Sequence, residues 1–233
     1  TTMSSSDNIT WTGTFTPTDN KKDASNSLSL ATSYIDTVGN LGTAETTANF
    51  EVDTQAPSVD SFRLSDTVLK AGETAMVTLV FSEAVASFSS DDDITVTNGT
   101  LATMTSSNKI TWSGTFTPNA NTDAPSNTLS LDTSYTDTAG NAGPAATANY
   151  VVETRVPLVS NIVISSASGI QNNLLNAGDV VSVTSTFSED MIVTNTPLLP
   201  LVVGSTSLNA SYTTSGSGST TLVFKYTIQA GDN

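Results

Sequence analysis

The 233-residue sequence contains no cysteine and no histidine, and aromatic residues make up only 6% of it. Without Cys and His, the chain can form neither a Ser-His-Asp or Cys-His nucleophile nor a His/Cys zinc site. Disulfides are excluded as well. This lack does not indicate a cytosolic protein, because a secreted protein can be stabilised by bound metal ions in place of disulfides.

Basic residues are also scarce. The chain has 7 Lys and Arg against 22 Asp and Glu, which gives a net charge of −15. Nucleic acids and anionic membrane surfaces are bound through Lys and Arg, so we expect neither as a partner. No apolar run approaches the roughly 20 residues of a membrane span, so we expect no membrane insertion in this segment. The many carboxylates instead supply the hard oxygen ligands that suit Ca²⁺.

The sequence repeats itself at an offset of 101 residues. Residues 11–42 and 112–143 are identical at 20 of 32 positions. A more divergent match relates residues 69–85 to residues 175–191, which share Leu, Ala-Gly, an acid, alternating Val and Thr, and Phe-Ser-Glu. Chance convergence to this degree is implausible, so the chain contains a duplicated unit.

These matches predict three repeats. Residues 1–57 form the C-terminal part of one, residues 58–157 a complete one, and residues 158–233 the N-terminal part of a divergent one. The chain then begins and ends within a repeat, as a piece of a longer tandem array does. The two end segments of neighbouring molecules are poor candidates to complete each other, because Trp11 to Phe15 and Phe224 to Ile228 both supply the aromatic strand.

The hydrophobic pattern has the period of two that β-strands show. In AMVTLVF, residues 75–81, every second residue from Ala75 is expected on one face. Ile110, Trp112, Gly114 and Phe116 share a face in the same way. Thr and Ser together supply 74 of 233 residues, which suits the polar outer face of strands. No stretch has a helical period, so we expect no helices.

Turn signals recur at intervals of about 8–12 residues, which separates seven or so short strands within the complete repeat. This predicts an all-β chain of tandem immunoglobulin-like β-sandwiches, one complete and two partial. Trp112 and Phe116 are the expected core anchors, and Trp11 and Phe15 repeat them. SGSGST, residues 215–220, is expected to form the tip of a hairpin.

Five short segments stand out: FSEAV (81–85), DITVTNGTL (93–101), WSGTFTP (112–118), TDTAGN (136–141) and VDTQAP (52–57). Together they resemble the bacterial immunoglobulin-like repeats of giant secreted adhesins and biofilm-associated proteins. The resemblance covers nearly all of residues 1–157, and the third repeat is similar to a different subtype. It implies a secreted or cell-surface structural module whose partners are neighbouring repeats of the same protein.

Acidic residues gather at one pole of the predicted sandwich. In an immunoglobulin-like fold the loops 82–93 and 136–143 lie at the same end as the incoming linker, 52–57. These segments carry six acids: Asp53, Glu83, Asp91, Asp92, Asp93 and Asp137. So many carboxylates would repel one another unless a cation intervenes. Ca²⁺ takes 6–8 oxygen ligands and is the natural occupant.

The resemblance implies the same ion, because repeats of this kind hold Ca²⁺ at inter-domain junctions. It assigns ligand roles to Asp53, Glu83 and Asp137, which stand in matching motifs. Asn141 is expected to form the turn first and to ligate second. The alternative is that these acids are solvated loop residues. An enzyme is not expected, because glycosidase chemistry needs two carboxylates across a cleft and these acids belong to a repeated loop.

The two junctions differ in sequence. At the second one Glu153 replaces Asp53 and Arg155 replaces Gln55, so a guanidinium can neutralise the carboxylates in place of a metal. Glu189 and Asp190 keep the acidic position after Phe-Ser, but no third acidic loop follows in that repeat. We therefore expect weak or absent calcium binding there. Asp36 repeats Asp137, and its site is expected to be incomplete.

These observations predict a structural function: a calcium-stiffened rod in a bacterial surface or extracellular adhesin that supports adhesion or biofilm formation. One alternative is a polymerising extracellular filament subunit with strands shared between neighbouring chains. Another is a glycan-binding module, although the two Trp residues occupy equivalent strand positions that suit a core better than a sugar-binding surface.

Overall fold

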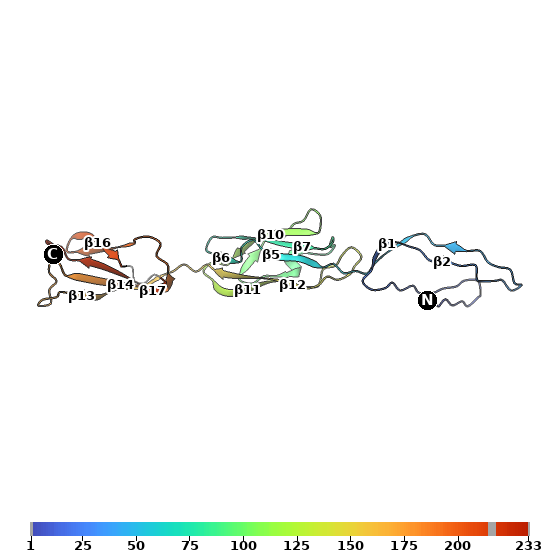
Figure 1. Ribbon diagram of the computed structural model, residues 1–233, viewed down its shortest axis with the longest axis horizontal. Helices are drawn as coiled ribbons and strands as arrows, with labels where there is room; N and C mark the ends of the chain where they lie inside the picture. The colour runs from blue at the N-terminus through green and yellow to red at the C-terminus, as the bar shows by residue number, and fades with distance from the viewer. Residues whose placement is uncertain (1, 214–217, 233) are drawn as a thin grey trace. The chain divides into compact units, whose positions relative to one another are not determined.

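The computed structural model describes residues 2–213 and 218–232, and it is almost entirely β (Figure 1). This confirms the all-β class. The described residues contain one short helix, α1 (Ser90–Asp93), and none long and apolar enough to cross a membrane. The chain divides between Arg155 and Val156 into two compact units.

Residues 58–155, here called the middle repeat, form a two-sheet sandwich. The first sheet has the order β5 (Val59–Leu64), β7 (Ala75–Phe81), β10 (Thr111–Pro118), β9 (Gly99–Leu101). The second has the order β6 (Val68–Lys70), β12 (Ala146–Glu153), β11 (Asp123–Leu131), β8 (Ile94–Thr95). All neighbours are antiparallel except β6 and β12, which are parallel. The predicted immunoglobulin-like sandwich is confirmed.

The core of the middle repeat follows the predicted alternation. In β7 the inward-facing residues are buried, whereas the residues between them are not. The buried four are Ala75, Val77, Leu79 and Phe81. Phe116 is fully buried, and Trp112 packs edge-to-face on Phe88 with ring centroids 4.9 Å apart. The second sheet covers this layer with its own buried residues, among them Leu129, Leu131 and Val152. Both expected core anchors of the middle repeat therefore lie where the sequence predicted.

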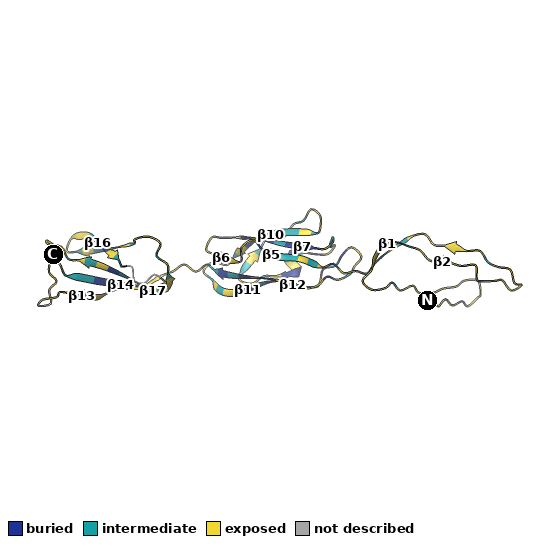
Figure 2. Cartoon of the chain, viewed as in Figure 1, coloured by how far each residue is buried: buried dark blue, intermediate teal, exposed yellow. Residues whose placement is uncertain are grey.

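Residues 2–53 contain the same motifs but are mostly exposed (Figure 2). Here β1 (Lys22–Asn26) pairs with β4 (Phe50–Asp53), and β2 (Ser29–Leu30) pairs with β3 (Glu45–Thr46). Trp11 and Phe15 are about half exposed. The expectation that they anchor a core is therefore wrong in this structure, because residues 2–53 contain no counterpart of residues 58–101, which supply many of the core side chains of the middle repeat.

The second unit is built on one antiparallel sheet, with the order β13-β14-β17-β16-β15. Its strands are β13 (Val159–Ser168), β14 (Val180–Met191), β15 (Leu198–Val203), β16 (Thr206–Tyr212) and β17 (Ser219–Thr227). A small cluster of Ala210, Leu222 and Phe224 is its buried core. Residues 215–217 of the expected hairpin tip lie outside the described residues. The repeat boundaries at 57/58 and 157/158 stay predictions.

The difference in burial between Phe15 and its counterpart Phe116 can be tested directly. In a Trp11→Phe background, where Trp112 is the only tryptophan, we expect Phe116→Ala to lower the free energy of unfolding by about 3–5 kcal/mol. Phe15→Ala should cost less than about 1 kcal/mol, because Phe15 is half exposed. Urea unfolding followed by Trp112 fluorescence measures both. Equal losses in the two variants would contradict the structure.

Candidate metal centre at the first junction

A tight turn before β12 sets the geometry of the site. The Asp137 carboxylate Oδ1 accepts the backbone N–H groups of Ala139 and Asn141, both at 2.9 Å. Gly140 has a φ of +96°, a left-handed conformation that glycine adopts without steric cost. The same turn forms at Asp36, with Gly39 at a φ of +98°. The motif Asp-Thr-x-Gly-Asn therefore determines this turn locally.

Asn141 connects the turn to the incoming linker. Its side-chain amide Nδ2 donates to Asp137 Oδ2 at 2.8 Å. The same Nδ2 lies 3.2 Å from the backbone carbonyl oxygens of Asp53 and of Gln55, to which it also donates. The linker thus lies against the turn with its carbonyl groups facing Asn141. Asn141 thus contacts the turn and the linker through its side chain, while Gly140 takes the left-handed backbone conformation. The site roles expected for Asn141 stay predictions.

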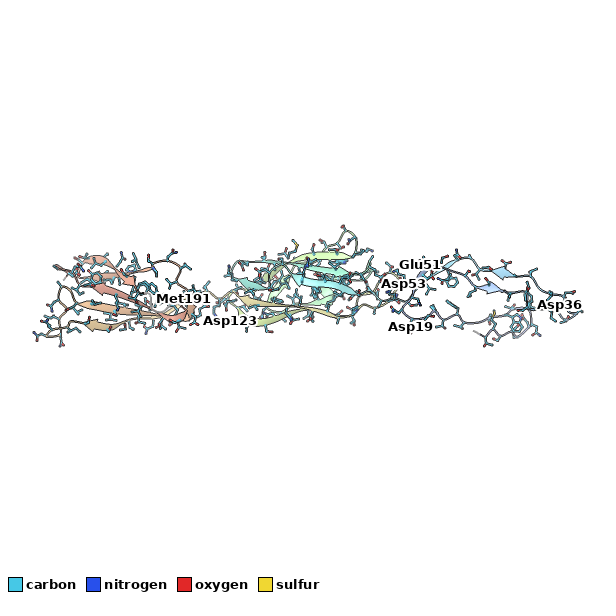
Figure 3. The ribbon with its side chains drawn as sticks, in the orientation of Figure 1. Asp19, Asp36, Glu51, Asp53, Asp123 and Met191 are labelled. Atoms are coloured by element: carbon cyan, nitrogen blue, oxygen red, sulfur yellow. The ribbon has the colours of Figure 1, made fainter. Side chains whose placement is uncertain are left out.

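Three of the predicted ligands meet at this place: Asp53 from the end of β4, Glu83 after β7, and Asp137 from the turn. One carboxylate oxygen from each lies within 4.8 Å of the others. Asp137 is 1% exposed, and the side chains of Asp53 and Glu83 are 8% and 20% exposed. Figure 3 labels Asp53 at this end of the middle repeat and Asp123 at the opposite end. The topology of the fold therefore brings together acids that are 84 residues apart in sequence, from 53 to 137.

A lysine that sequence reasoning missed lies on this cluster. The Lys22 ammonium group, from β1, is 2.8 Å from Asp53 Oδ2 and also donates to Glu83. The hydrogen bond to Asp53 is the main reason that the pKa of Lys22 is raised, and the one to Glu83 adds to it. Three carboxylates and one ammonium leave a local charge of −2. Alignment of the two copies could have pointed to this contact, because Lys22 stands where the second copy has Asp123, a change in the sign of the charge.

Asp137 is the most buried acid of the cluster. Its burial by itself would raise its pKa, but hydrogen bonds from the Asn141 side chain and from the backbone of Asn141, Ala139 and Gly140 outweigh that effect. The pKa of Asp137 is consequently lowered. Asp137 is therefore held as a carboxylate, the form in which it can ligate a cation.

The other predicted acids lie elsewhere. Asp91, Asp92 and Asp93 form the helix α1, which the sequence did not predict. Three carboxylates in a first helical turn are favourable because they face the positive end of the helix dipole. Asp91 accepts a hydrogen bond from Thr103, and Asp93 is buried, with Ser134 and the Ser89 backbone N–H donating to it. These three do not join the cluster of Asp53, Glu83 and Asp137.

At the other end of the middle repeat, the cation and the carboxylate have exchanged places between strand and linker. There the Arg155 guanidinium donates to the Asp123 carboxylate, and the Arg155 backbone N–H donates to the Glu153 carboxylate at 3.1 Å. In the first copy the cation is on β1, as Lys22, whereas in the second it is on the linker, as Arg155. The weak or absent calcium binding expected at the second junction stays a prediction, and Asp36 lies exposed in its turn.

Comparison with known families identifies the class of this protein. The family described as bacterial Ig-like domain matches residues 1–52 and again residues 53–152. These two consecutive matches cover more than half of the chain, so the chain belongs to the bacterial Ig-like domain family.

Comparison with individual proteins adds one similarity. None of the curated proteins matches the chain. A solved structure described as FdeC, a broadly conserved Escherichia coli adhesin that elicits protection against urinary tract infections, is 17% identical, with a TM-score of 0.44. The match covers 92% of this chain and 79% of that one.

The lowered pKa of Asp137 predicts how junction stability depends on pH. A lowered folded-state pKa contributes stability above the unfolded value of about 3.9, and this contribution is lost as the pH falls through the folded value. Asp137→Asn should lower the free energy of unfolding by about 1–3 kcal/mol at pH 7, because its amide would face the Asn141 amide. The difference from wild type should shrink towards pH 2.

Urea midpoints measured between pH 7 and pH 2 test this. Asp60→Asn, which removes an exposed carboxylate of the same repeat, serves as the control and should differ little from wild type. A loss of stability in Asp137→Asn that is independent of pH would show that the ionised carboxylate is not what matters.

Proposed function

We propose that this chain is a repeat region of a bacterial surface or secreted adhesin, without catalytic activity. Two consecutive repeats of one family carry this proposal. Their connection supports a structural role: Asn141 of the middle repeat binds the linker, and Asp53, Glu83 and Asp137 meet beside it. Such a module acts mechanically, by holding a distal binding region away from the cell in support of adhesion or biofilm formation.

We further propose that Ca²⁺ stiffens the first junction. The cluster carries a charge of −2 after Lys22 is counted, and like charges this close favour a divalent cation. Carboxylates and backbone carbonyls are ligands that Ca²⁺ prefers. A hollow of about 360 Å³, lined by Glu51, Asp53, Thr138 and Ala139, adjoins the cluster at Asp53.

Calcium bound here would connect three separate segments: the linker, the loop after β7 and the turn before β12. Extracellular calcium modules have dissociation constants of about 10⁻⁴ to 10⁻³ M. About 10 mM Ca²⁺ would then stabilise the folded junction by roughly 1.4 to 2.7 kcal/mol. Junction stiffness would accordingly vary with the calcium concentration of the medium.

Calcium should bind to the protein and raise its melting temperature. We expect isothermal titration in chelator-treated buffer to give one site, and the melting temperature to rise between chelator and about 10 mM Ca²⁺. Glu83→Gln removes a ligand charge and should weaken binding about tenfold or more. Asp19→Asn, the loss of an exposed carboxylate outside the cluster, is the control. Identical melting with calcium and with chelator would rule out the calcium proposal.

Lys22 should compete with calcium for the same oxygens. Lys22→Met removes the ammonium, so it should lower the melting temperature in chelator and raise the calcium affinity by about tenfold. Lys21→Met makes the same change of charge at the adjacent exposed residue and is the matched control. Equal effects of the two variants on calcium affinity would mean that net charge alone, and not the position of Lys22, is responsible.

A further inference from the structure

The chain enters and leaves the middle repeat at opposite ends. The incoming linker carries Asp53, whereas the outgoing residue Arg155 donates to Asp123, which Figure 3 labels at the other end. A pull on the two ends of the chain therefore enters the middle repeat at Ser58 and leaves it at Thr154. It acts first on the strands next to these points, which are β5 and β6 after the entry and β12 before the exit.

Strands β6 and β12 are the parallel pair of the repeat. Val68 lies opposite Val151, and the Val151 N–H donates to the Thr67 carbonyl at 2.8 Å. Both strands run towards the exit, so a pull along the chain draws β6 back towards the entry and β12 out through the exit. The two strands are then sheared along their length. Because the pull acts on all the hydrogen bonds between them at once, these bonds must break together and not one by one.

Strand β5 is pulled in the same way, along its own axis from Val59, while it is paired with β7. Two hydrogen bonds hold the entry beside it. The Ser58 N–H donates to Ser82 Oγ at 2.9 Å, and the Ser82 N–H donates to the Ser58 carbonyl at 3.0 Å. In the second unit Leu158 and Ser188 make the same two bonds. The serine of Phe-Ser-Glu therefore ties the incoming chain to its repeat.

Thr154 holds the exit. Its backbone N–H donates to the Thr122 carbonyl at 2.7 Å, and its side-chain Oγ1 accepts the Thr122 N–H at 2.9 Å. The same hydroxyl donates to the Asn119 carbonyl at 2.6 Å. We call these three hydrogen bonds the exit latch. Thr154 is 5% exposed, so the latch is shielded from water, which would otherwise compete for its donors and acceptors.

The first copy of the duplicated sequence forms the same latch. The Thr54 N–H donates to the Lys21 carbonyl at 2.7 Å, and Thr54 Oγ1 accepts the Lys21 N–H at 2.9 Å. The Thr54 hydroxyl also donates to the Thr18 carbonyl, at 2.8 Å. The residues on both sides of this threonine differ between the two copies, whereas the latch is the same. The latch is therefore separate from the charges of the junction.

We propose that the middle repeat resists tension along the chain, through the shear of β6 against β12 and through the exit latch at Thr154. This deepens the proposed adhesin role and rests on it for its biological purpose, because a repeat between a cell and a distal binding region is pulled from both sides. The resistance itself is a property of the folded repeat and does not involve calcium.

Pulling the same repeat in two directions tests the shear geometry. The sequence has no cysteine, so introduced cysteines are unique attachment points. In the end-to-end form, one cysteine is added at each end of the full chain. In the peeled form, Ala71→Cys and Val156→Cys place both attachments at the exit, where β6 and β12 end side by side, so these strands separate from one end. Both positions are exposed, so we expect the substitutions to leave the fold unchanged.

Optical tweezers, at equal loading rates and in the presence of chelator, measure the unfolding force. In the end-to-end form the middle repeat releases at most roughly 350 Å of chain, more than the shorter second unit does. We expect its unfolding force to be at least about twice that of the peeled form, because the sheared bonds must break together. An equal or lower force in the end-to-end form would overturn the proposal.

The exit latch is tested in the end-to-end form at constant force. Thr154→Val removes the hydroxyl at similar volume and should raise the unfolding rate about tenfold or more, because a buried N–H and a buried carbonyl lose their partner. Thr154→Ser keeps the hydroxyl and should stay within about twofold of wild type. Thr115→Val, at an exposed threonine of β10, is the matched control and should also stay within about twofold.

If Thr154→Val unfolds no faster than Thr115→Val, the exit latch bears no tension and its part in the proposal is wrong. The unfolding force is measured without calcium and without any binding partner. A mechanically weak repeat would therefore leave the adhesin and calcium proposals standing, and failure of the calcium titrations would leave the mechanical proposal standing.

Discussion

A sheet with one apolar face is stable only when a second layer covers that face, and this constraint governs the whole chain. In the middle repeat, β7 and β10 bury their apolar side chains against β11 and β12. Residues 2–53 repeat the second half of this arrangement, yet Phe15 and Tyr34 are exposed where Phe116 and Tyr135 are buried. Burial here is a property of the pair of layers and not of either sequence alone.

The junction obeys a different constraint, the balance of charge among groups that the fold forces together. Asp137 and Asn141 form a turn determined by local hydrogen bonds, and this turn then holds the linker through backbone carbonyls. Holding the linker places Asp53 beside Asp137 and Glu83. Lys22 offsets part of the resulting negative charge. At the other end of the repeat the cation is Arg155, on the linker, and it pairs with Asp123, which stands at the position of Lys22. The duplicated fold thus keeps its turn while its charges vary.

Much of this was predictable because it depends on short-range pattern. The alternation in residues 75–81, the duplication and the Asp-Thr-x-Gly-Asn turns follow from neighbouring residues, and the structure confirms the two-sheet sandwich. Asp53, Glu83 and Asp137 were predicted to meet because the order of strands in the sandwich places their loops at one end. Asp91, Asp92 and Asp93 were misplaced, since an acidic run can solvate a loop or start a helix and only packing decides which.

By itself, the sequence determined the all-β class, the repeat and the turns, because period-two patterning and backbone preferences act over a few residues. Tertiary structure decided which copy of each apolar residue is buried, and it brought the Lys22 ammonium group to Asp53 and Glu83. Both outcomes depend on contacts between segments distant in the chain. Identical motifs can therefore acquire different environments, because an exposed side chain and a buried one differ only in what packs against them.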